Sequence, residues 1–108
     1  MATVYKVLGQ SAPSAVTNTT LYTVPASTSA VCSTLAICNR GATTTVRVAI
    51  RPAGATLANQ HYIVYDNSVN QYDTIFLTLG VTLATTDVVT VYAGTANTSF
   101  SLFGSEIT

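Results

Sequence analysis

Hydrophobic and polar side chains alternate with a period of two along most of this chain. The pattern is clearest around Val46, Val48 and Ile50, which are separated by single residues of the opposite face. Successive side chains of a β-strand point to opposite faces of a sheet, so the alternation indicates strands with one buried face. It predicts about eight short strands, at residues 3–8, 21–24, 30–38, 44–51, 60–66, 72–79, 88–93 and 99–103.

Turn-forming residues separate these strands, and one connection differs from the rest. Residues 79–87 are too many for a tight hairpin and include Val81 and Leu83, so this segment resembles the crossover between the sheets of an Ig-like sandwich. Strands at this spacing predict an all-β fold, a two-sheet antiparallel β-sandwich, Ig-like or jelly-roll-like, in a single domain at residues 1–108. The predicted core consists of Val31, Leu35, Ile37, Val46, Val48, Ile50, Tyr62, Val64, Ile75, Leu77, Leu83, Val89, Val91, Phe100 and Leu102.

Charge is scarce and balanced. Four basic and four acidic residues among 108 give 7% charged residues and no net charge, whereas an ordinary globular chain is about 25% charged. A surface of this kind lacks charge repulsion between copies, which favours an assembly subunit; a small monomer made soluble by hydroxyls and amides is the alternative. With no basic excess, we expect no binding to nucleic acid or to a membrane.

The beginning of the sequence has no basic region followed by an apolar run and a cleavage site. No apolar stretch approaches the roughly 18 residues that a membrane-spanning helix needs. We therefore expect a protein that is made in a cytosol and remains soluble or assembles there.

Residues that could perform catalysis are few. The single histidine, His61, falls in a predicted strand, where we expect a partly exposed sheet residue and not a general base. Asp66, Asp73 and Asp87 fall at predicted strand ends, where hydrogen bonds in turns account for each of them. We therefore predict a non-enzymatic protein with no catalytic, cofactor-binding or metal-binding residues.

The two cysteines, Cys32 and Cys38, lie in one predicted strand. Six residues of strand span about 20 Å, which is too far for a disulfide between them. We expect both to be free thiols that pack as small buried hydrophobic residues.

Two uncharged segments are predicted to contact other proteins. Residues 2–8 and the loop at 53–59 carry little charge and can lie flat on a neighbour, and the six tyrosines exceed what one small core needs. We expect a closed homo-oligomer, with a trimer as the leading possibility, or a subunit that occurs only in a lattice. The predicted interface residues are Ala2, Val4, Tyr5, Ala53, Ala55, Leu57, Ala58 and Asn59.

Three stretches resemble a known class of protein. Residues 4–13 (Val-Tyr-Lys-Val-Leu-Gly-Gln-Ser-Ala-Pro), residues 51–63 and residues 87–93 are similar to small virion structural proteins of tailed bacteriophages, and the resemblance extends from end to end of the chain. It implies a β-sandwich subunit on the capsid surface or in the tail and fibre apparatus. No catalytic or ligand-binding residue is implied by it.

The resemblance and the composition together lead to the expected function. We expect a capsid decoration or cement protein that binds the major capsid protein or other virion structural proteins, in a virion assembled in the cytoplasm of a bacterial host. A tail, neck or fibre component is one alternative. A carbohydrate-binding module for host adhesion is the other, and exposed aromatic side chains on one face would favour it.

Overall fold

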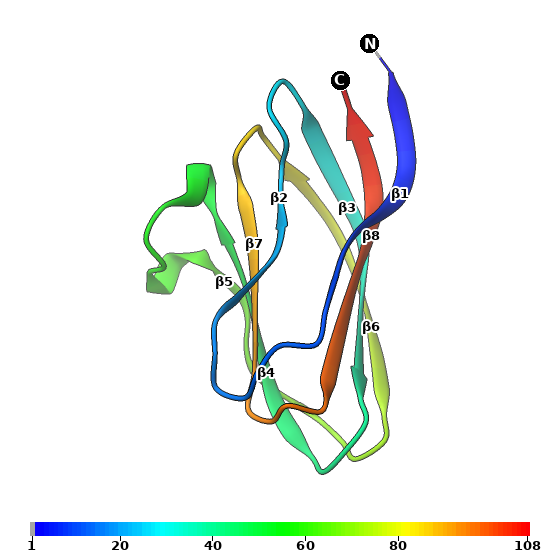
Figure 1. Cartoon of the computed structure of the whole chain (residues 1–108), viewed down its shortest axis with the longest axis vertical. Coiled ribbons are helices and arrows are strands. Elements are labelled where there is room, and N and C mark those ends of the chain that lie inside the picture. The colour runs from blue at the N-terminus through cyan, green and yellow to red at the C-terminus, as the bar shows by residue number, and fades with distance from the viewer. Residues whose placement is uncertain (1) are drawn as a thin grey trace.

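The computed structural model describes residues 2–108, which form two four-stranded antiparallel sheets packed face to face (Figure 1). The predicted fold class, an all-β two-sheet sandwich, is confirmed. The strands are β1 (Thr3–Ser11), β2 (Thr19–Thr23), β3 (Ser29–Asn39), β4 (Thr44–Arg51), β5 (Tyr62–Val69), β6 (Thr74–Leu83), β7 (Val88–Ala93) and β8 (Thr98–Ile107). Two short 3₁₀ turns, η1 (Pro52–Gly54) and η2 (Asn59–His61), lie between β4 and β5.

The strand order identifies the topology. Sheet A has the order β1-β8-β3-β6 and sheet B the order β2-β7-β4-β5. Each strand therefore pairs with its mirror image in the sequence, β1 with β8, β2 with β7, β3 with β6 and β4 with β5, as in a long hairpin that has been rolled up. This is the jelly-roll arrangement, and the order differs from that of an Ig sandwich.

The segment at 79–87 is mostly strand. The chain does change sheets between β6 and β7, as predicted, but β6 continues through Leu83 and the turn is confined to 84–87. The reason is that Val81 and Leu83 pack toward the core as part of β6. The side chain of Asp87 closes the turn by accepting hydrogen bonds from the backbone N–H groups of Ala84 and Ala53, both at 2.9 Å.

A row of β-bulges crosses sheet A. The pairing register shifts at Leu8 in β1 and at Ser33 in β3, on the two sides of Phe103 of β8, and at residues 79–80 in β6, opposite Ser33. The Ser33 hydroxyl donates a hydrogen bond of 3.2 Å to the Phe103 carbonyl oxygen. Bulges bend the strands that carry them, so the sheet changes direction along this row.

The bulge in β3 explains two wrong predictions. Ala30 and Cys32 are buried before the bulge, whereas Leu35 and Ile37 are buried after it, so the inward positions change from even to odd numbers. Val31 therefore faces outward and is only half-buried, although the alternation placed it in the core. The second wrong prediction is the burial of Cys38, which faces outward after the bulge and is half-exposed, whereas Cys32 is buried as expected. Both cysteines are free thiols on the same strand.

Most of the predicted core is confirmed. The buried members are Leu35, Ile37, Val46, Val48, Leu83, Val89, Val91, Phe100 and Leu102, and those partly buried against them are Ile50, Val64, Ile75 and Leu77. Tyr62 was predicted to lie in the core, and this is wrong. A register shift between Val48 and Ala49 turns its side chain to the outer side of β5. Cys32 is buried in the core, as expected for a small hydrophobic residue. The core also contains residues outside the prediction: Leu8, Leu21, Tyr22, Val24, Ala30, Val69 and Ala93.

Candidate functional site

The strand residues on the outer face of sheet A are uncharged. Arg40, which follows β3, reaches one end of this face, where its Nε donates a hydrogen bond of 3.1 Å to Ser99 Oγ. The register defines this face, since Ser105 pairs with Val31 and Tyr5, and Ala36 pairs with Ser101 and Phe76. We call it the uncharged face. Its members are Thr3, Tyr5, Val7, Gln10, Ser29, Val31, Ser33, Thr34, Ala36, Cys38, Thr74, Phe76, Thr78, Thr82, Ser99, Ser101, Phe103, Ser105 and Ile107.

Large apolar side chains on this face are open to solvent. Tyr5 is 85% exposed, Phe76 69% and Val7 45%. The centres of protein interfaces are depleted in charged residues and enriched in aromatic ones, and soluble monomers rarely leave such a patch uncovered. The uncharged face therefore has the composition of a protein-contact surface.

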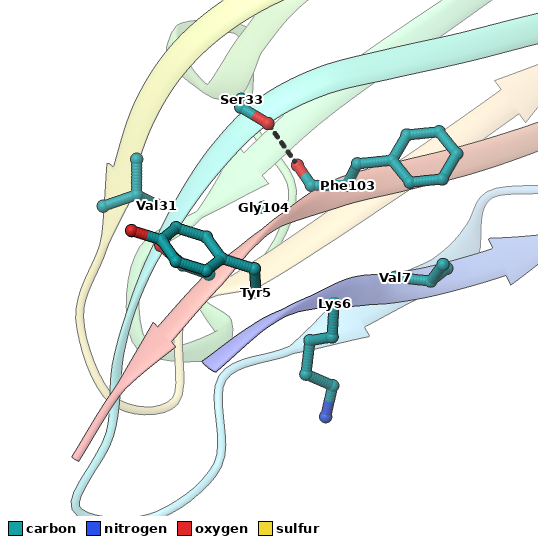
Figure 2. A pocket seen from close by; sticks show the side chains of 8 residues that line it. Tyr5, Lys6, Val7, Val31, Ser33, Phe103 and Gly104 are labelled. Carbon is teal, nitrogen blue, oxygen red and sulfur yellow. Dashed lines mark hydrogen bonds between the residues drawn. The ribbon is translucent and has the colours of Figure 1, made fainter. Parts of the chain in front are cut away.

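A hollow of about 590 Å³ opens in the uncharged face beside the row of bulges (Figure 2). The residues that line it are Tyr5, Lys6, Val7, Val31, Ser33, Phe103, Gly104 and Ser105. Gly104 contributes only backbone atoms, and the Lys6 side chain extends away from the other labelled side chains. The hollow is thus bordered mainly by aromatic and aliphatic groups and suits an apolar side chain.

The charge of Lys6 is neutralised locally. Its Nζ lies 3.2 Å from Glu106 Oε1, and the Tyr22 hydroxyl donates a hydrogen bond of 2.6 Å to Glu106 Oε2. The hydrogen bond from Tyr22, followed by that from Lys6, lowers the pKa of Glu106, while burial opposes this change. Burial and the contact with Glu106 raise the pKa of Tyr22 well above its ordinary value, and burial raises the pKa of nearby Cys32 to about 11.

Removing the Tyr22 hydroxyl is expected to make stability less dependent on pH. The folded-state pKa of Glu106 lies below its unfolded value, so the hydrogen-bonded carboxylate stabilises the fold above about pH 4.3 and this stabilisation is lost as the pH falls. Tyr22→Phe should lower the free energy of unfolding by about 1–2 kcal/mol at neutral pH and by less in acid. Urea unfolding of the variant and the wild type at neutral and at acid pH measures the two losses, with a substitution at an exposed tyrosine, Tyr72→Phe, as control. An equal loss at both pH values would contradict it.

The outer side of sheet B has a different character. The guanidinium of Arg47 lies 4.4 Å from the ring centres of both Tyr65 and Tyr92, and its Nε lies 2.6 Å from Asp66 Oδ1. The hydrogen bond to Asp66 is the main cause that raises the pKa of Arg47. Asp66 was predicted to belong to a turn, and this is wrong. It lies within β5 and is the ion-pair partner of Arg47.

A shallow hollow of about 360 Å³ lies next to this cluster, lined by Asn59, Tyr62 and Tyr65. The two tyrosine rings meet edge to face with their centres 4.9 Å apart. Aromatic rings beside an amide can bind a small polar ligand with an apolar face. This is the second candidate site of the molecule.

The predicted interface residues are divided between the two sheets. Tyr5 is on the uncharged face, and Ala2 and Val4 are exposed beside it at the edge of sheet A. The loop residues follow β4 of sheet B, on the side of the molecule opposite to β1 in Figure 1. Among them Ala53, Ala55 and Asn59 are exposed, whereas Leu57 and Ala58 are half-buried.

The sequence analysis missed Phe76 and Phe103 as surface residues. Phe76 lies between the inward-facing Ile75 and Leu77, so the alternation within 72–79 already placed it on the outer face. No comparable signal existed for Phe103, whose direction depends on its pairing with Val7 and Thr34 at the row of bulges.

His61 differs from its prediction. It is buried in η2, just before β5, and its Nδ1 accepts a hydrogen bond of 3.0 Å from the Ala58 backbone N–H. The imidazole therefore holds the loop against the sheet. Within residues 2–108, no three His, Cys, Asp or Glu side chains gather closely enough to hold a metal ion. The same residues include no helix with the length and apolar character needed to cross a membrane.

Comparisons with protein-family models, with curated proteins and with solved structures gave no significant match.

Proposed function

We propose that this protein is a non-enzymatic structural subunit of a phage virion, present on the head as a decoration or cement protein. The observation that carries the proposal is the uncharged face, on which four strands present aromatic, aliphatic and hydroxyl side chains and which a charged group, that of Arg40, reaches at one end. Such a face is suited to lie against a neighbouring subunit. The jelly-roll architecture adds support by analogy, because it recurs in viral capsid domains as well as in lectins.

A decoration protein acts by binding the assembled head in preference to its separated parts. Mass action then raises the stability of the head as its sites fill. A small domain with few charges can occupy many equivalent sites side by side without repulsion between copies. The partners under this proposal are the major capsid protein and further copies of the chain.

Particles that lack this protein are expected to assemble but to release their genome at a lower temperature. Added wild-type protein should restore heat resistance in a saturable manner. Val7→Glu, which places a charge at the hollow, should restore it poorly, whereas Tyr72→Glu changes an exposed aromatic residue outside the uncharged face and should restore it fully. Normal heat resistance without the protein would refute the proposal.

The hollow beside Tyr62 and Tyr65 favours a second candidate function, carbohydrate binding for host adhesion. This alternative, like a tail, neck or fibre position, predicts that particles lacking the protein keep their heat resistance but adsorb poorly to cells. Tyr65→Ala should then reduce adsorption, and Phe76→Ala should not. Measuring genome release and adsorption on the same deletion separates the two functions.

A further inference from the structure

The uncharged face contains both a projecting side chain and a hollow that can receive it. Phe76 projects from β6 and is 69% exposed. The hollow lies at the row of bulges and is bordered by β1, β8 and β3. Phe76 pairs with Ala36, whereas Gly104 pairs with Cys32, so the ring and the hollow of one copy lie apart and cannot meet.

A twofold axis brings them together between two copies. An axis that lies along the interface, midway between Phe76 and the hollow and perpendicular to the line that joins them, places each ring over the hollow of the other copy. Both insertions form at once, because an isologous contact uses the same patch on both subunits. We propose that a second copy of this chain binds the uncharged face, with Phe76 of each copy inserted into the hollow of the other. This contact closes a dimer, in place of the trimer expected from the sequence.

Size and volume agree with this contact. The molecule is 44 Å long, and four strands about 4.8 Å apart give a face of up to about 800 Å², the area that each partner contributes to a standard specific interface. The hollow of about 590 Å³ is large enough for a phenyl ring and is bordered by Tyr5, Val31 and Phe103. Rings in such a contact can pack edge to face or in offset stacks.

Charge favours a second copy as the occupant. A twofold contact brings a face against itself, so any charge on that face meets a like charge nearby. The strand residues of the uncharged face carry no charge, and Lys6 at the rim of the hollow is already paired with Glu106 at 3.2 Å. Arg40 reaches this face only at its end, beside Ser99 and away from the hollow. A charged partner would gain no electrostatic attraction from this face. A second copy of the face meets no electrostatic repulsion.

The first experiment measures the mass of the purified protein by sedimentation from micromolar to submillimolar concentration. The wild-type chain is expected to dimerise. Phe76→Ala removes two rings from each dimer and should raise the dissociation constant about 100-fold. Tyr72→Ala removes a similarly exposed ring outside the uncharged face and should leave the constant unchanged.

A second pair of variants tests the insertion itself. Ser33→Trp fills the hollow and should also abolish dimerisation, with Val7→Trp as a substitute if thermal unfolding shows that the first variant is not folded. Mixed together, Phe76→Ala and Ser33→Trp regain one insertion, in which Phe76 of the second variant enters the open hollow of the first. The mixture should therefore associate more tightly than either variant alone.

Three results would overturn the inference: a wild-type monomer at all concentrations, an unchanged constant for Phe76→Ala, or a mixture no tighter than its components. The inference rests on the proposed function only in taking the uncharged face as the contact surface. Dimers without any effect on particles would refute the virion function alone, and restored particles with a monomeric protein would refute the twofold contact alone.

Discussion

Gly104→Ala is expected to destabilise the fold by about 3 kcal/mol or more, because overpacking against rigid neighbours cannot be relieved locally. A methyl group at this position would collide with the carbonyl oxygen of Val31 and lie 3.1 Å from the Cα of Cys32. These are backbone atoms of β3, so relief requires β3 and β8 to separate at the row of bulges. Chemical denaturation of the purified variant measures the loss.

Gly80→Ala is the matched control. Gly80 has a φ of +64° in the bulge of β6, and no atom lies within 4 Å of the added methyl group. The cost there comes only from the left-handed backbone and should be about 1–2 kcal/mol. A loss for Gly80→Ala that equals or exceeds the loss for Gly104→Ala would show that the close approach of β3 to β8 is unimportant.

Asn39→Leu is the second substitution with a large expected effect, about 3–5 kcal/mol of destabilisation. Asn39 is 1% exposed, and the two hydrogens of its Nδ2 are shared among the carbonyl oxygens of Ala42, Val69 and Asn70, which lie at 2.9, 3.2 and 3.1 Å. Its Oδ1 accepts a bond of 3.1 Å from the Gly41 N–H. Leucine leaves these backbone groups without their partner, in a region where water cannot easily replace it.

Thr98→Val provides the comparison for this buried site. Thr98 pairs with Asn39 across β8 and β3 and is fully buried, and its hydroxyl has no hydrogen-bond partner within residues 2–108. Exchanging this hydroxyl for a methyl group should be neutral or slightly stabilising. Similar losses for the two variants in thermal unfolding would contradict the role assigned to the Asn39 amide.

The sequence was sufficient to predict the fold class, because the period of two is a local property. Residues 44–51 and 88–93 have the predicted strand bounds in the structure. Strand order was beyond prediction, since the pairing of β1 with β8 joins residues about a hundred positions apart. β8 was predicted to end at Phe103, but it continues past Gly104 because the backbone ladder with β1 and β3 extends to Ile107.

The candidate site was harder to predict than the fold. Tyr5 was identified, yet the loop that was grouped with it belongs to the other sheet. The uncharged face combines strands that are far apart in the sequence, so its existence depends on the jelly-roll order. Val31 illustrates the difficulty, because one extra residue at Ser33 reverses its direction and no periodic pattern announces such a bulge.

The rolled hairpin also has a consequence for biosynthesis. β8, the last strand along the chain, occupies an interior position of sheet A between β1 and β3. While the ribosome is still producing β8, neither β1 nor the β3–β6 pair has its central neighbour, and sheet A cannot close. Non-local pairing of this kind is slow, and open strand edges promote aggregation. A nascent chain with so few charges is therefore expected to need chaperone protection until β8 has emerged.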